Sequence, residues 1–329
     1  MPLTDLDSGD PALPLFRADN GTVALTFLPA AGGRLLSIVV AGHELLWRNP
    51  QYFDANFRAV RSRSSWAELD GTFGSWANIG GSKTWPAPQG WAGQGEWAGP
   101  PDAVLDAGVW SINAMEGDSG DMIVTMTSPD DDRTGLRITR RFEIPVEGAE
   151  FSQVTTFANV SDHPIVWAIW EVCQVDTSAG AGLSGADAAI EVDVEESSAS
   201  ASVNLGDYRG ALVADQAGHR IIVPIQDVVA KRGFPSASGR IAYRGPNGGL
   251  EILFEPVAGA EYPDGGSRAE IWLQSPQTQP ITELSGLHPD AYLAELEVLS
   301  PRSVIEPSSS IDYTLRWRVT APLTATRTN

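Results

Sequence analysis

Two glutamates stand two positions apart in residues 292–300, a segment whose side chains alternate as in a β-strand. Because alternate residues of a strand point to the same side, Glu295 and Glu297 share one face at about 6.5–7 Å. Two such carboxylates repel each other when both are charged, which raises one pKa and supplies a base together with an acid. This pairing suits sugars, whose hydroxyl and ring oxygens exchange protons. The alternative is a strand face in contact with solvent.

A second strand, predicted over residues 269–274, places polar groups around an indole. Glu270, Trp272 and Gln274 share one of its faces. An indole flanked by hydrogen-bonding side chains is a suitable platform for a sugar ring. The alternative is a solvated face that one tryptophan covers.

Residues 165–175 are largely apolar on both sides, which predicts a central strand. Trp170 and Gln174 share one face, whereas Glu171 and Cys173 share the other. Polar groups in such a strand must find partners or line a cavity. Glu171 and Gln174 are therefore candidate site residues, and Trp170 is a candidate contact for a ligand.

Residues 80–91 predict a rigid loop, because prolines fix its backbone and a glycine pair frees it. Lys83 is one of two lysines in the chain, the other being Lys231. Beside Trp85, its ammonium could donate to sugar hydroxyls. The alternative is an exposed lysine on a structural loop.

The four histidines, His43, His163, His219 and His288, form no closely spaced pair, and no metal site is predicted. The chain also lacks the Gly-x-Ser-x-Gly and Gly-x-x-x-x-Gly-Lys motifs, and no cofactor is predicted. His163 precedes a proline between two strands and is expected in a surface turn. His288 lies just before the strand with the two glutamates and is a candidate site residue; the alternative is a plain loop residue.

The elements that must position these residues are almost all strands and turns. Many short alternating segments with frequent turn signals, and no helix of ten or more residues, predict an all-β sandwich or barrel. We expect a single domain over residues 1–329, with loose ends at 1–14 and 321–329. Residues 178–202, rich in Ala, Ser, Gly and Asp, predict an exposed excursion around one weak strand.

Composition excludes several classes of partner. The 329 residues include 22 Lys and Arg against 42 Asp and Glu, a net charge of −20, which argues against nucleic acid and anionic membranes. Cys173 is the single cysteine, so no internal disulfide forms. The N-terminus lacks the pattern of a secretory signal and no apolar run is long enough to span a membrane. We therefore expect a cytoplasmic protein whose partner is a small carbohydrate; the oligomeric state is not predicted.

Several stretches, in order over residues 20–320, resemble the galactose mutarotase-like superfamily, and within it a bacterial branch related to aldose 1-epimerases. They are Ala31-Gly-Gly-Arg-Leu-Leu-Ser, Gly80-Gly-Ser-Lys-Thr-Trp-Pro-Ala-Pro-Gln, Ser128-Pro through Arg140-Arg-Phe, Asn159-Val-Ser-Asp, Trp170-Glu-Val-Cys-Gln, Tyr262-Pro-Asp-Gly-Gly, and Ala294-Glu-Leu-Glu-Val-Leu-Ser-Pro with Trp317. The resemblance implies a β-supersandwich with a sugar site on its concave face. It also implies a late glutamate as the base on the anomeric hydroxyl, where Glu295 or Glu297 falls.

The family's mid-chain histidine, which protonates the ring oxygen, has no counterpart here. Glu171, His288 or Lys83 could take its place, and Glu297, nearer the following turn, is the favoured base. The main hypothesis is an epimerase or mutarotase-like isomerase that uses carboxylate acid–base chemistry. The alternatives are a carbohydrate-binding protein without catalysis and a relative of polysaccharide lyases or hydrolases.

Overall fold

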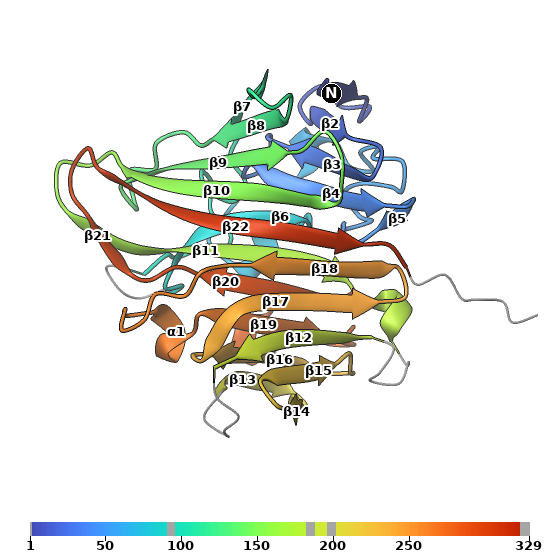
Figure 1. The fold of residues 1–329 in the computed structure, drawn as a ribbon, viewed down its shortest axis with the longest axis vertical. Coiled ribbons are helices and arrows are strands. Elements are labelled where there is room, and N and C mark those ends of the chain that lie inside the picture. The colour runs from blue at the N-terminus through green and yellow to red at the C-terminus, as the bar shows by residue number, and fades with distance from the viewer. Residues whose placement is uncertain (1, 91–95, 182–187, 196–201, 323–329) are drawn as a thin grey trace, which may run out of the picture.

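The computed structural model describes residues 2–90, 96–181, 188–195 and 202–322. Strands account for 50% of the chain and helices for 5%, which confirms the all-β prediction. The strands form two large antiparallel sheets that lie face to face as a β-sandwich (Figure 1). In the described residues, no helix is long and apolar enough to cross a membrane.

The first sheet has twelve strands among the described residues. Its path is β1 (Thr4–Leu6), β2 (Leu15–Asp19), β3 (Val23–Leu28), β4 (Arg34–Val40), β6 (Ser82–Ala87), β11 (Ile165–Asp176), β20 (Leu293–Leu299), β19 (Ala269–Gln274), β16 (Val229–Phe234) and β13 (Val203–Arg209), with β5 (His43–Glu44) and β21 (Ser303–Ile305) attached to β4 and β11. The strands of the candidate site therefore lie side by side in its centre.

The second sheet has ten strands among the described residues and covers one face of the first. Its path is β14 (Asp215–Ala217), β15 (Arg220–Pro224), β12 (Ala189–Val194), β17 (Ala237–Gly245), β18 (Gly248–Leu253), β22 (Ser310–Thr320), β10 (Glu150–Asn159), β9 (Leu136–Ile144), β8 (Met122–Thr127) and β7 (Ser111–Glu116). The hydrophobic core fills the space between the two sheets.

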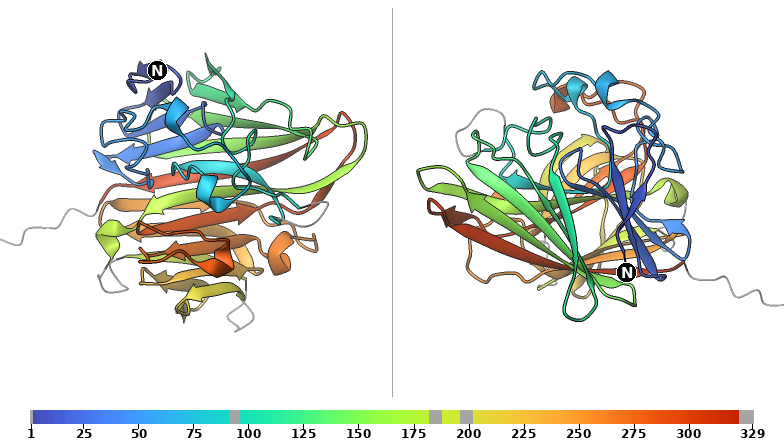
Figure 2. Two further views of the ribbon diagram at one scale, coloured as in Figure 1. Left: turned by 180° about the vertical axis from the view of Figure 1, so that it is seen from behind. Right: turned by 90° about the horizontal axis from the view of Figure 1, so that it is seen from above.

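The other face of the first sheet is covered by loops, as the view from behind shows (Figure 2, left). These loops carry the short turns η1 (Arg63–Ser65), η2 (Phe73–Ser75) and η5 (Thr282–Leu284). Elsewhere among the described residues, the helical segments are η3 (Ser178–Gly180) and α1 (Pro263–Gly266). We call this loop-covered side the outward face.

Two local predictions are wrong. Residues 80–91 contain strand β6, because the side chains of Ser82–Ala87 are buried and the strand pairs with β11 along its length. Pro86 lacks a backbone N–H group, but β4 pairs with β6 only at Leu35–Ser82. No backbone hydrogen bond to β4 is therefore required at Pro86. The N-terminus is not loose: β1 pairs with β2, and Leu13 is fully buried. Residues 323–329 and most of 182–201 lie outside the described residues.

Candidate functional site

A single row of four side chains crosses the outward face of the first sheet. Gln174 on β11 is the register partner of Glu295 on β20, which pairs with Trp272 on β19, which pairs with Lys231 on β16. Directly paired residues of an antiparallel sheet project to the same side. The row therefore places an amide, a carboxylate, an indole and an ammonium group in sequence on one surface.

All four residues of this row line a cavity of about 140 Å³. Aromatic side chains from the loops and from the sheet form part of its walls: Phe73, Trp76, Trp85, Trp170 and Tyr208. The structure thus brings Trp85, Trp170 and Trp272 to one cavity, although 187 positions separate the first from the last. Apolar walls with a few convergent polar groups are typical of small-molecule sites.

Glu295 is the member of the glutamate pair that reaches this cavity. Its Oε1 accepts a hydrogen bond of 2.7 Å from Gln174 Nε2 and lies 3.5 Å from Lys83 Nζ. Its side chain is 14% exposed. The carboxylate is thus oriented by two donors and remains open on one side.

Glu297 points to the same face but is fully buried beneath the lining. Its Oε2 accepts hydrogen bonds from Trp170 Nε1 at 2.7 Å and from Lys231 Nζ at 3.0 Å. Glu270, its cross-strand partner, is also fully buried and forms an ion pair with Lys231 at 2.7 Å. The position of Glu297 does not fit the prediction that it is the base, because other residues cover its carboxylate and Lys231 forms an ion pair with it.

Two buried carboxylates share the one ammonium of Lys231. Burial raises the pKa of Glu270 and of Glu297; Lys231 opposes this rise, and the neighbouring acids add to it. Burial lowers the pKa of Lys231, but the attraction of Glu270 and Glu297 outweighs this and raises it above its usual value. Lys231 is therefore held charged, and the pair of acids favours a state in which one of them keeps a proton.

Lys83 does not line the cavity as the sequence predicts, because it is only 1% exposed. Its Nζ lies 4.9 Å from the Trp85 ring centroid and contacts Glu295. Burial lowers the pKa of Lys83 to about 8, with Arg34 lowering it further and Glu295 and Asp106 raising it. Among the lining residues of the cavity, Lys83 contacts Glu295 and Trp85.

Glu171 lies on the opposite face of β11 and is not part of the cavity. It is fully buried between the sheets, where Arg140 donates at 2.8 Å and Gln153 at 2.8 Å. Ser82 and Thr84 also donate to it. The strand alternation that separates Glu171 from Gln174 makes it a core residue, so its prediction as a catalytic acid is wrong.

His288 is likewise outside the cavity. It is exposed on the loop before β20, and its Nε2 lies 2.8 Å from the carbonyl oxygen of Gln277. None of the four histidines of the chain is among the residues that line the cavity. The prediction of His288 as an acid fails because nearness in sequence to β20 does not place a loop side chain above it.

The three predicted indoles differ in what they offer a ligand. Lys231 Nζ lies 4.7 Å from the Trp170 ring centroid. Trp85 packs against Trp170 and Trp97 at 5.4 and 4.9 Å between centroids. Trp272 lies in the centre of the row and packs against Tyr208 at 5.8 Å. Trp272 is therefore the best placed platform, whereas the other two form walls.

Sequence reasoning missed Lys231, Tyr208 and Trp76 as lining residues. The scarcity of lysine was a usable signal, since both lysines of the chain lie at this site. Tyr208 and Trp76 come from segments with no pattern of their own, and only the tertiary fold brings them to the cavity.

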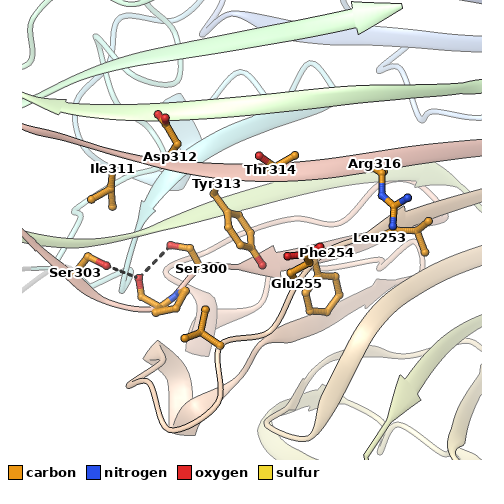
Figure 3. Close-up of a pocket in the computed structure, with 12 residues that line it drawn as sticks. Leu253, Phe254, Glu255, Ser300, Ser303, Ile311, Asp312, Tyr313, Thr314 and Arg316 are labelled. Carbon is orange, nitrogen blue, oxygen red and sulfur yellow. Dashed lines mark hydrogen bonds between the residues drawn. The ribbon is translucent and has the colours of Figure 1, made fainter. Parts of the chain in front are cut away.

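A larger groove of about 710 Å³ lies elsewhere in the molecule (Figure 3). It is lined by the end of β18 and the residues after it, by residues that follow β20, and by the first half of β22. Tyr313, Ser300 and Phe254 lie around it, with Asp312 and Arg316 at β22. Tyr313 already donates to the backbone of Leu299. The groove contains none of the predicted site residues, so we place the functional site at the smaller cavity.

The described residues contain no group of three or more His, Cys, Asp or Glu side chains that could hold a metal ion.

No protein-family model matches the chain, and a search of curated proteins also finds no match. Among solved structures, a "putative mutarotase (YeaD)" from Salmonella typhimurium superimposes with a TM-score of 0.59 at 13% identity, over 97% of this chain and 94% of that one. A "putative aldose 1-epimerase" from Klebsiella pneumoniae gives 0.56 at 13%, over 94% and 80%.

A TPR-domain containing protein from Parabacteroides distasonis gives a TM-score of 0.59 at 12% identity. The match covers all of this chain but only 55% of that protein, so this chain spans about half its length. At these identities the likeness establishes the fold alone. The chain has the β-sandwich fold of galactose mutarotase-like proteins and resembles them over nearly its whole length.

Proposed function

We propose that the protein is a carbohydrate-active isomerase that interconverts the anomers of an aldose in the cavity of the first sheet. The observation that carries this proposal is the row Gln174–Glu295–Trp272–Lys231. In this row Trp272 offers a stacking surface, with the base Glu295 on one side of it and the cation of Lys231 on the other. The fold likeness to proteins described as mutarotases and aldose epimerases supports the same substrate class.

In this mechanism a sugar ring stacks on Trp272 and presents its anomeric hydroxyl to Glu295. The carboxylate accepts the hydroxyl proton, the bond between the anomeric carbon and the ring oxygen breaks, and the ring oxygen takes up a proton. Rotation about the bond to the carbonyl carbon and re-closure give the other anomer. Gln174 and Lys83 orient Glu295 for this step.

A second candidate is a carbohydrate-binding protein without catalysis. It is favoured by the absence of every histidine from the cavity lining, since a family isomerase would use one as acid. Binding alone would need the platform and the hydrogen-bonding groups but no matched acid and base.

The two candidates are separated by polarimetry on freshly dissolved pure anomers of several aldoses, with and without the protein. The isomerase accelerates the change in rotation for at least one sugar, and Glu295→Gln removes the acceleration. A sugar that binds, as shown by tryptophan fluorescence, but does not anomerise faster would support the binding protein instead.

A further inference from the structure

The proposed reaction needs an acid beside the ring oxygen, and the structure limits the choice. Glu295 is assigned as the base, and Glu171 faces the core. Lys83, Glu270 and Glu297 are covered by other residues. Of the titratable side chains in the cavity lining, only Glu295, Tyr208 and Lys231 remain among the described residues.

Lys231 lies on the other side of the Trp272 platform from Glu295. The two residues pair with Trp272 from neighbouring strands, so their Cα atoms are about two strand spacings, roughly 10 Å, apart. Both side chains line the same cavity. A ring stacked between them can have its anomeric hydroxyl at one and its ring oxygen toward the other.

We propose, on the basis of the isomerase function above, that Lys231 protonates the ring oxygen as the sugar opens, and that the Glu270–Glu297 pair resupplies its proton. Lys231 Nζ lies 2.7 Å from Glu270 and 3.0 Å from Glu297, so each carboxyl group is within proton-transfer distance. Both oxygens of Glu270, and Oε1 of Glu297, accept no hydrogen bond among the described residues. This leaves room for a proton on the pair.

The step balances without any added reagent. Glu295 takes the proton of the anomeric hydroxyl, whose oxygen forms the carbonyl double bond while the electron pair of the broken bond stays on the ring oxygen. That oxygen takes a proton from the Lys231 ammonium, and the resulting amine takes one from the neutral acid of the pair. On re-closure every transfer runs in reverse, so the protein returns to its starting state.

The strong hold on the Lys231 proton is compatible with this role. Burial lowers the pKa of Lys231, but the two acids raise it by more than burial lowers it. The group is therefore charged before the reaction begins. The leaving ring oxygen develops alkoxide character, and an alkoxide is basic enough to take a proton from an ammonium group.

The test uses the full-length protein with Lys231→Ala combined with Glu270→Gln, which removes one positive and one negative charge together. Replacing Glu270 as well avoids leaving both Glu270 and Glu297 buried without the Lys231 ammonium. Circular dichroism checks that the double variant folds. We expect kcat for anomerisation to fall at least about 100-fold, with KM changed much less. Arg232→Met is the matched control, because it removes a cation from the same strand on the opposite face; its kcat should stay within about twofold.

Added amines then distinguish proton donation from charge alone. Ethylammonium should raise the kcat of the double variant at least about tenfold. In a series of amines, the rescued rate should depend on the pKa of the amine. Guanidinium, which carries the charge but gives up its proton poorly, should restore almost none.

If the wild-type protein turns over an aldose, three results would overturn this inference alone. They are a double variant with unimpaired kcat, no rescue by any amine, and equal rescue by guanidinium. A wild-type protein without turnover on any aldose would contradict the proposed function itself, and the inference with it.

Discussion

Gln174 Nε2 donates a 2.7 Å hydrogen bond to Glu295 Oε1, and the two residues are direct register partners on β11 and β20. The neighbouring Glu297 instead accepts from Trp170 and Lys231 and is fully buried. Two residues of one strand face therefore have different environments. One carboxylate is oriented toward a cavity, and the other belongs to a buried ionic cluster.

This difference predicts the effects of two isosteric substitutions. Glu295→Gln should lower kcat for anomerisation at least about 100-fold and leave the melting temperature almost unchanged, because the amide keeps the packing but cannot act as base. Glu297→Gln should cost less than Glu295→Gln, since Glu270 still holds Lys231 and only the resupply of its proton is impaired. Polarimetry and thermal unfolding measure both. A larger loss of turnover in Glu297→Gln than in Glu295→Gln would reverse the assignment.

Glu171 should behave as a structural residue. Glu171→Gln leaves the Arg140 guanidinium buried without its counter-charge, and breaking a buried ion pair costs about 3–5 kcal/mol. The melting temperature should fall by several degrees, whereas turnover per folded molecule should stay near the wild-type value. Calorimetry together with activity at low temperature tests this. Lost turnover with an unchanged melting temperature would return Glu171 to the mechanism.

Lys83 should give the protein a measurable pH dependence of stability. Its pKa falls from 10.5 to about 8 on folding, mainly through burial. Between these pH values the unfolded chain binds a proton that the folded protein has released, so stability rises with pH across this window. The destabilisation is fully present below about pH 8.

The Lys83→Met variant isolates this effect. The difference in unfolding free energy, wild type minus Lys83→Met, should become more favourable by roughly 3 kcal/mol between pH 7 and pH 10.5. Urea unfolding at several pH values measures it. A difference that does not vary with pH would mean that Lys83 titrates normally in the folded protein.

Trp272 should be the tryptophan on which ligand binding depends. Trp272→Ala should abolish the change in intrinsic fluorescence caused by millimolar neutral sugar, because it removes the centre of the row. The control is Trp317→Phe. Trp317 is fully buried, stacks on Phe151 at 5.7 Å and lies outside the cavity.

The control variant should lower the melting temperature and leave the sugar response intact. If Trp272→Ala keeps the full response, the ligand stacks elsewhere or does not stack at all.

Strand alternation made much of the site predictable. It assigned Glu295, Trp272 and Gln174 to single faces of their strands, and the register shows that these faces coincide. It could not predict which residue of a face is covered by loops, and so it favoured Glu297 over Glu295. Residues 80–91 misled because proline and glycine signals describe local backbone freedom, whereas pairing with β11 makes a strand of Ser82–Ala87.

The ion pairs of the site could not be predicted from the sequence for a related reason. Lys231 meets Glu270 and Glu297 through sheet pairings between segments about 40 and 66 positions away, and no local pattern encodes such pairings. Likewise, the contact of Glu171 with Arg140 depends on how the two sheets stack. A strand pattern gives the side on which a residue lies, but not what lies opposite.

The most direct test of the central claim is a crystal structure of the protein soaked with a neutral aldose that shifts its fluorescence. We expect the ring to lie on Trp272, with its anomeric hydroxyl within hydrogen-bond distance of the Glu295 carboxylate and its ring oxygen toward Lys231 Nζ. Density for the sugar only in the groove beside β22, or in the cavity with the anomeric carbon turned away from Glu295, would contradict the account.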